Sequence, residues 1–220
     1  MFEDRGEAGR ELAKKLAALR LRDPLVLALP RGGVPVGLEV AAFLGAPLEA
    51  FVVRKLGVPG HEEFGFGAVA QDGTTVVDQA VVAELGISAE QVSGVIRREK
   101  AEVHRRVKLY RGGRRGLMLA RKNVVVVDDG LATGVSMRVA VEAVLKQRPK
   151  RLVVAVPVGS GDAVSSLRER LRPADEVVCL DTPENFSAVG MWYRHFPQVT
   201  DEEVVRVLEE ARARFRAGKV

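Results

Sequence analysis

The sequence predicts an α/β fold in which a mostly parallel sheet of five or six strands is flanked by helices. Short apolar runs alternate repeatedly with segments of helical periodicity, as in strand–helix–strand units with right-handed crossovers. The apolar runs are continuous rather than alternating, which is typical of strands buried on both faces. A length of 220 residues, with 47% hydrophobic and 29% charged residues, suits one globular domain spanning residues 1–220.

The N-terminal half predicts two strands and two helices before an irregular stretch. In chain order these elements are a helix (7–21), a strand (25–29), a helix (34–44) and a strand (48–53). Residues 56–73 follow, and their many glycines predict a flexible loop with at most a short strand at 66–70. This half therefore supplies the first two strands of the sheet.

The C-terminal half continues the alternation and contains the most hydrophobic strand. Its predicted elements are a strand (74–77), a helix (88–110), a strand (123–127), a helix (136–146), a strand (151–156), a helix (162–171), a strand (176–180) and a helix (201–217). Ser88 and Gln91 have the spacing of a capping box at the start of the long, basic helix. An irregular aromatic segment, 186–196, precedes the last helix.

Two adjacent carboxylates, Asp128 and Asp129, follow the most hydrophobic strand. Parallel sheets bind ligands at this end of their strands, and two neighbouring carboxylates repel each other unless cations or hydroxyl groups satisfy them. A plain Asp-Gly turn would explain one aspartate but not both. The glycines and hydroxyl groups that follow, at the start of the next helix, are typical of a phosphate-binding turn. These are Gly130, Thr133, Gly134 and Ser136.

A hydrophobic strand followed by Asp-Asp, a short loop, Thr-Gly and Ser resembles the phosphoribosyl pyrophosphate (PRPP) signature of the type I phosphoribosyltransferases. The resemblance implies that Asp128 and Asp129 hold the ribose and act in catalysis. It also implies that the 5′-phosphate lies on the next loop, formed by Gly130, Leu131, Ala132, Thr133, Gly134, Val135 and Ser136.

A second segment, Leu29–Pro35, resembles the pyrophosphate loop of the same family. The resemblance implies a non-proline cis peptide bond entering Arg31, a rare feature in proteins. It assigns pyrophosphate binding to Arg31, Gly32 and Gly33, and to Arg54 and Lys55 after the second strand. Residues 56–73 would then be the flexible loop that closes over the site. The alternative for Arg54 and Lys55 is that they are simply solvated.

The activity that the resemblance implies is transfer of ribose 5-phosphate from Mg-PRPP to a nitrogen acceptor, with release of pyrophosphate. Arg31 and Lys55 would stabilise the leaving group together with Mg²⁺, which is held mainly by PRPP, with Asp128 and Asp129 as further candidate ligands. Family members that use 6-oxopurines usually carry an acid where this chain has Ala132, so a different nucleobase is expected.

The acceptor pocket of this family lies in a variable hood, here expected mainly at residues 181–200 with an N-terminal contribution. The candidate acceptor residues are Phe186, Trp192 and Tyr193, because aromatic faces stack on bases. The alternative is that these rings pack the segment onto the sheet. A homodimer is also implied by the resemblance.

A dense basic run keeps a second function open. It comprises Arg97, Arg98, Lys100, Arg105, Arg106, Lys108, Arg111, Arg114 and Arg115. Most such runs are solvated helix faces, but some relatives of this family are PRPP-sensing regulators that bind RNA or DNA. A third reading is a non-catalytic module that binds PRPP or another phosphorylated metabolite.

Composition and charge bear on the ligand and on the cellular location. A formal net charge of +5 suits an anionic ligand but does not require nucleic acid. No apolar stretch approaches the roughly 20 residues that a membrane span needs, and the charged N-terminus does not resemble a signal peptide. Cys179 is the only cysteine, so an internal disulfide is excluded and a cytoplasmic location is expected.

Overall fold

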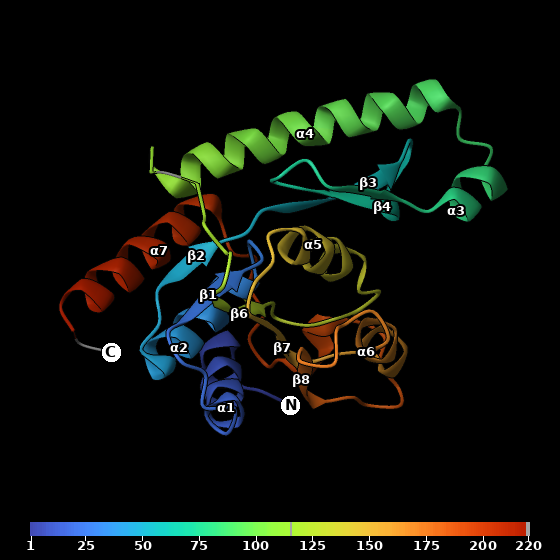
Figure 1. Cartoon of the computed structure of the whole chain (residues 1–220). Coiled ribbons are helices and arrows are strands. Elements are labelled where there is room, and N and C mark those ends of the chain that lie inside the picture. The colour runs from blue at the N-terminus through green and yellow to red at the C-terminus, as the bar shows by residue number, and fades with distance from the viewer. Residues whose placement is uncertain (115, 219–220) are drawn as a thin grey trace.

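A computed structural model describes residues 1–114 and 116–218 and confirms the predicted α/β class (Figure 1). Its central sheet has five strands in the order β2-β1-β6-β7-β8, and every neighbouring pair is parallel. The strands are β1 (Pro24–Ala28), β2 (Leu48–Ala50), β6 (Asn123–Val127), β7 (Arg151–Val158) and β8 (Glu176–Asp181). Arg115, the last residue of the basic run, lies outside the described residues.

Helices cover both faces of this sheet, as Figure 1 shows. One layer consists of α1 (Arg5–Ala17), α2 (Gly33–Leu44) and α7 (Asp201–Arg216), and the other of α5 (Val135–Lys146) and α6 (Gly161–Arg168). Alternate residues of β6 enter the two layers: Val125 and Val127 pack into one core, Val124 and Val126 into the other. Burial on both faces explains why residues 124–127 of this strand are all valine.

A second sheet replaces the predicted loop at 56–73. It is antiparallel and consists of β3 (Val53–Val58), β4 (His61–Ala70) and β5 (Thr75–Val77). It lies between the long helix α4 (Ala89–Arg111) and α5 (Figure 1). The loop prediction was wrong for most of the segment because Leu56 and Phe66 are fully buried, and this burial offsets the poor strand propensity of the glycines.

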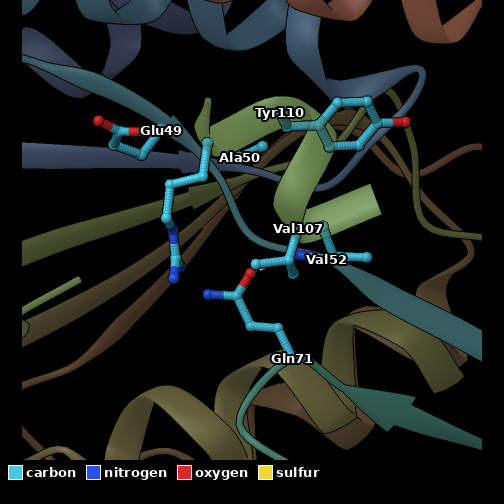
Figure 2. Close-up of a pocket in the computed structure, with 7 residues that line it drawn as sticks. Glu49, Ala50, Val52, Gln71, Val107 and Tyr110 are labelled. Carbon is cyan, nitrogen blue, oxygen red and sulfur yellow. Dashed lines mark hydrogen bonds between the residues drawn. The ribbon is translucent and has the colours of Figure 1, made fainter. Parts of the chain in front are cut away.

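The predicted strand at 48–53 is in fact divided between the two sheets. The amide of Val52 donates to Oε1 of Gln71 at 3.0 Å and so takes no part in the parallel ladder (Figure 2). Arg54 and Lys55 consequently lie within β3 rather than at the end of β2. The cavity in Figure 2, where the chain passes under α4, holds only about 10 Å³.

Local signals set the ends of several helices. The predicted capping box of Ser88 and Gln91 is present at the start of α4. Helix α1 begins earlier than predicted, because Asp4 caps it by accepting from the amide of Glu7. A short helix that the periodicity did not indicate, α3 (Gln79–Glu84), follows the N-cap Asp78. Within the described chain, no helix is long and apolar enough to cross a membrane.

Candidate functional site

Two loops that are about 100 residues apart in sequence meet at the carboxyl ends of adjacent strands. The loop after β1, residues 29–33, contains the cis peptide bond Pro30–Arg31, as predicted for the bond entering Arg31. The loop after β6 carries Asp128 and Asp129. A Cβ atom at Gly32 would lie 1.9 Å from Oδ2 of Asp129, so only glycine permits this approach.

The two aspartates form a largely buried, like-charged pair. Oδ1 of Asp128 accepts a hydrogen bond of 2.9 Å from the amide of Asp129. Burial raises the pKa of the Asp128 carboxyl well above its ordinary value, and the charge of Asp129 raises it further. Burial also raises the pKa of Asp129, although Arg5 acts in the opposite direction. Such a pair is suited to a ligand that brings hydroxyl donors or a cation.

Arg5 is a site residue that the sequence analysis missed. Its Nε lies 2.8 Å from Oδ2 of Asp129, and its Nη1 donates to the carbonyl of Pro197 at 2.8 Å. Its guanidinium group lies 3.7 Å from the centre of the Phe196 ring, and the residue is only 8% exposed. The sequence did contain a signal, because Arg5 has the helical spacing of Ala8 and Leu12 and so lies on the apolar face of α1.

The segment from Gly130 to Ser136 forms a turn rich in free N–H groups. Leu131 ties it to the end of β7 through hydrogen bonds with Val158 and Ser160, each of 2.9 Å. The N–H groups of residues 132–137 donate to no acceptor among the residues that the structure describes. Because α5 begins here, at Val135, these groups and the helix dipole together favour an anion.

Two adjoining cavities border these loops. The first, of about 190 Å³, is lined by Lys55, Asp128, Asp129, Gly130, Leu131, Ala132, Thr133, Gly134, Val135, Ser136, Met137 and Val189. The second, of about 380 Å³, is lined by Pro30, Val53, Arg54, Lys55, Gly57, Glu62, Arg98, Glu99, Arg106 and Ser136. Lys55 and Ser136 line both, so the cavity beside the basic residues of β3 adjoins the cavity beside the N–H-rich turn.

Arg31, unlike Lys55 and the aspartates, lies outside the two cavities. Its Nη1 is 3.8 Å from Oδ1 of Asp201, at the start of α7, and Arg31 is not among the lining residues of either cavity. Arg105 and Tyr110 contact the same carboxylate. The direct part of Arg31 in the chemistry therefore stays a prediction.

The aromatic residues predicted for the acceptor pocket belong to one cluster, and Tyr193 joins this cluster to the acidic loop. Tyr193 is buried, its hydroxyl donates to the carbonyl of Asp129 at 2.6 Å, and its ring centre is 4.9 Å from that of Phe196. Phe186 and Trp192 pack against the same cluster. None of the three predicted aromatics lines either cavity; the residue that does so from this segment is Val189, in a short 3-10 helix, η1 (Val189–Trp192).

Val189 of η1 packs closely against Gly130 of the acidic loop, and a substitution can test this contact. A Cβ atom at Gly130 would lie 2.5 Å from Cγ1 of Val189. Gly130→Ala is therefore expected to lower the free energy of unfolding by about 1–3 kcal/mol through overpacking. Urea denaturation of the full chain measures this change.

The matched control is the double variant Gly130→Ala with Val189→Ala. It removes the two methyl groups that clash and should recover most of the stability lost in the single variant. A double variant no more stable than Gly130→Ala alone would show that the cost has another origin.

Comparison with known proteins places this geometry in context. Residues 3–193 match the family described as phosphoribosyl transferase domain. A Mycobacterium tuberculosis protein, named provisionally as a phosphoribosyl transferase, is 45% identical over 221 residues, which cover 100% of this chain and 49% of that protein. The chain thus spans about half the length of the curated relatives it matches.

Solved structures share the fold. A Thermus thermophilus protein is 42% identical and superposes with a TM-score of 0.79, covering 95% of this chain and 98% of that chain. A hypothetical protein from Neisseria gonorrhoeae with bound ppGpp is 16% identical, with a TM-score of 0.52, and covers 96% and 98% of the two chains. At that identity the second likeness concerns the fold alone.

Proposed function

The chain belongs to the phosphoribosyl transferase family, and on that premise we propose that it transfers ribose 5-phosphate from Mg-PRPP to a nitrogen acceptor and releases pyrophosphate. The observation that carries the proposal is the contact between the Gly32 backbone and Asp129. It puts a loop suited to pyrophosphate beside the carboxylates suited to ribose. The N–H-rich turn that follows Asp129 is suited to the 5′-phosphate.

The carboxylates of Asp128 and Asp129 would accept hydrogen bonds from the ribose hydroxyl groups. They would also place negative charge below the ring as the bond to pyrophosphate breaks and the sugar becomes oxocarbenium-like. Fixed charges in a largely buried site stabilise such a transition state without reorganising. Their mutual repulsion is relieved when the ligand supplies hydroxyl donors.

The phosphate ends of PRPP would be held by different groups. The free N–H groups at residues 132–137 suit the 5′-phosphate, because they converge at the start of α5. Lys55 and Arg54 border the larger cavity and suit the pyrophosphate. Holding both ends orients the ribose between them, which lowers the entropic part of the barrier.

Magnesium would be bound mainly through PRPP. Among the described residues no group of three or more His, Cys, Asp or Glu side chains could hold a metal ion. Two carboxylates plus phosphate oxygens are nonetheless an ordinary set of ligands for Mg²⁺, so Asp128 and Asp129 fit as partial ligands. When bound, the ion would neutralise charge on the departing pyrophosphate.

For the acceptor we propose a nucleobase other than a 6-oxopurine, since Ala132 offers no acid or base. Val189 is the residue of the hood (residues 181–200 with the N-terminus) that lines the smaller cavity, and it would provide an apolar contact. Phe186, Trp192 and Tyr193 would support this surface from behind. A cytoplasmic location and a homodimer remain predictions from the single cysteine and the family resemblance.

Nucleotide formation tests the proposal. The full chain is incubated with Mg-PRPP and a mixed panel of purine and pyrimidine bases, and products are identified by mass spectrometry. A new nucleotide mass, with stoichiometric pyrophosphate, is the expected result, and Asp128→Asn should form it far more slowly. PRPP binding without any product would instead favour a PRPP-binding module or sensor.

A further inference from the structure

The basic helix α4 takes part in no step described so far, yet two of its arginines face the larger cavity. Arg98 and Arg106 line it together with Arg54 from β3 and Lys55. The helix packs along β3 and β4, as Figure 1 shows, and of its basic residues Arg98 and Arg106 reach the lining of the larger cavity. Part of the basic run therefore borders the site.

Arg54, Arg98 and Arg106 each donate a hydrogen bond to a glutamate through their own Nε atom. Nε of Arg54 donates to Oε2 of Glu99 at 2.9 Å, and Nε of Arg98 donates to Oε1 of Glu99 at 3.1 Å. Nε of Arg106 donates to Oε1 of Glu102 at 2.6 Å. The terminal guanidinium nitrogens of the three form no hydrogen bond with the residues that the structure describes.

Glu99 is the anchor of this arrangement. Its side chain is only 8% exposed, and its two carboxylate oxygens bind the two arginines separately. Buried charges are retained where they are paired and hydrogen-bonded, so Glu99 fixes both arginines in place. Glu99 lines the cavity and orients the two arginines beside it.

The charges that line the cavity favour an anion. Four cationic side chains, Arg54, Lys55, Arg98 and Arg106, face two acidic ones, Glu62 and Glu99. Glu102, behind Arg106, balances one further charge, which leaves four positive against three negative groups. Free guanidinium ends match phosphate oxygens in pairs, so several of them suit a pyrophosphate better than a single phosphate.

We propose that Arg98 and Arg106 of α4 complete the pyrophosphate end of the PRPP site, binding the anion through their terminal guanidinium nitrogens. Glu99 acts as a positioning residue for Arg54 and Arg98. This inference rests on the proposed function, because it assigns the larger cavity to the pyrophosphate of the same ligand.

Calorimetry on the full chain tests the inference with three probes: Mg-PRPP, inorganic pyrophosphate with Mg²⁺, and ribose 5-phosphate. Arg98→Gln with Arg106→Gln should weaken Mg-PRPP and pyrophosphate by at least about tenfold, the effect of one lost charge-assisted hydrogen bond. Ribose 5-phosphate should bind within about twofold of the wild-type affinity, because its phosphate lies on the other loop.

The matched control is Lys100→Gln with Lys108→Gln, which removes the same charge from exposed positions of α4 outside the larger cavity. An equal loss of pyrophosphate affinity in this control would show that the effect comes from the overall charge of the protein, and it would overturn the inference. So would unchanged affinity in the Arg98 and Arg106 variant. Arg98→Gln alone guards against misfolding, since that side chain is 59% exposed, and it should still weaken pyrophosphate binding several-fold.

The same titrations separate this inference from the proposed function. Wild-type protein that binds neither PRPP nor ribose 5-phosphate overturns the proposed function. Wild-type protein that binds Mg-PRPP, while the double variant retains that affinity, overturns only the role of α4.

Discussion

Replacing Asp128 by asparagine is expected to lower kcat/KM for PRPP by about 10²–10³-fold, the usual cost of removing one preorganised electrostatic group. The amide is nearly the same size as the carboxyl and can still accept from the amide of Asp129. What it lacks is the negative charge beneath the ribose. Steady-state rates with the acceptor found in the base panel, or PRPP affinity by calorimetry, measure the loss.

The same substitution is expected to raise the melting temperature at neutral pH. The carboxyl of Asp128 has a pKa raised by burial and by Asp129 from an ordinary 3.8, so the folded chain binds more protons than the unfolded chain between the two values. Stability therefore falls as the pH rises through this interval. Asp128→Asn removes that fall, and its melting curve should depend less on pH.

A thermal-shift series from about pH 4 to pH 8 checks this, since ordinary aspartate titrates near the lower limit. An inactive variant with a higher melting temperature shows that the acidic pair is maintained for function at a cost in stability. A variant with full activity contradicts the assignment of Asp128. A variant that is less stable at every pH contradicts the repulsion between the two carboxylates.

Replacing Arg5 by methionine is expected to lower the free energy of unfolding by about 3–5 kcal/mol, because it leaves the largely buried Asp129 carboxylate without its cation. The guanidinium also binds the carbonyl of Pro197 and stacks on Phe196, so the hood should loosen with it. Denaturant unfolding gives the stability, and proteolysis near residues 186–197 reports on the hood.

Arg10→Met is the matched control on the same helix. Arg10 is 3.6 Å from Glu39, and its side chain is 56% exposed, so its loss should cost less than about 1 kcal/mol. Adding Asp129→Asn to Arg5→Met should restore part of the stability, since the unpaired charge is then gone. If Arg5→Met costs no more than Arg10→Met, the ion pair with Asp129 does not hold the site together.

Much of the fold was predictable because apolar strands buried on both faces have a simple signature. The four consecutive valines of β6 and the Asp-Asp that follows them located the centre of the sheet and of the site. The loop at 29–33, with its cis bond, was predicted by resemblance. These features depend on residues close together in the sequence, where pattern and turn chemistry act.

The remaining features depend on contacts between distant segments. The strand at 74–77 was predicted and corresponds to β5, but most of β3 and β4 was missed. Their glycines are typical of a loop, and only the structure shows that Leu56 and Phe66 are buried. Arg5 was missed because a single arginine on an apolar face gives no indication of its partner 124 residues away. The basic run of α4 was ambiguous, because only the packing of α4 on β3 shows which arginines face the cavity.

The central claim is that the acidic pair, the N–H-rich turn and the loop at 29–33 form one site for PRPP. Calorimetric titration of the full chain with Mg-PRPP, alone and in the presence of ribose 5-phosphate or pyrophosphate, tests it most directly. We expect one PRPP site for which both fragments compete. No binding of PRPP, or fragments that bind without competing, would contradict it.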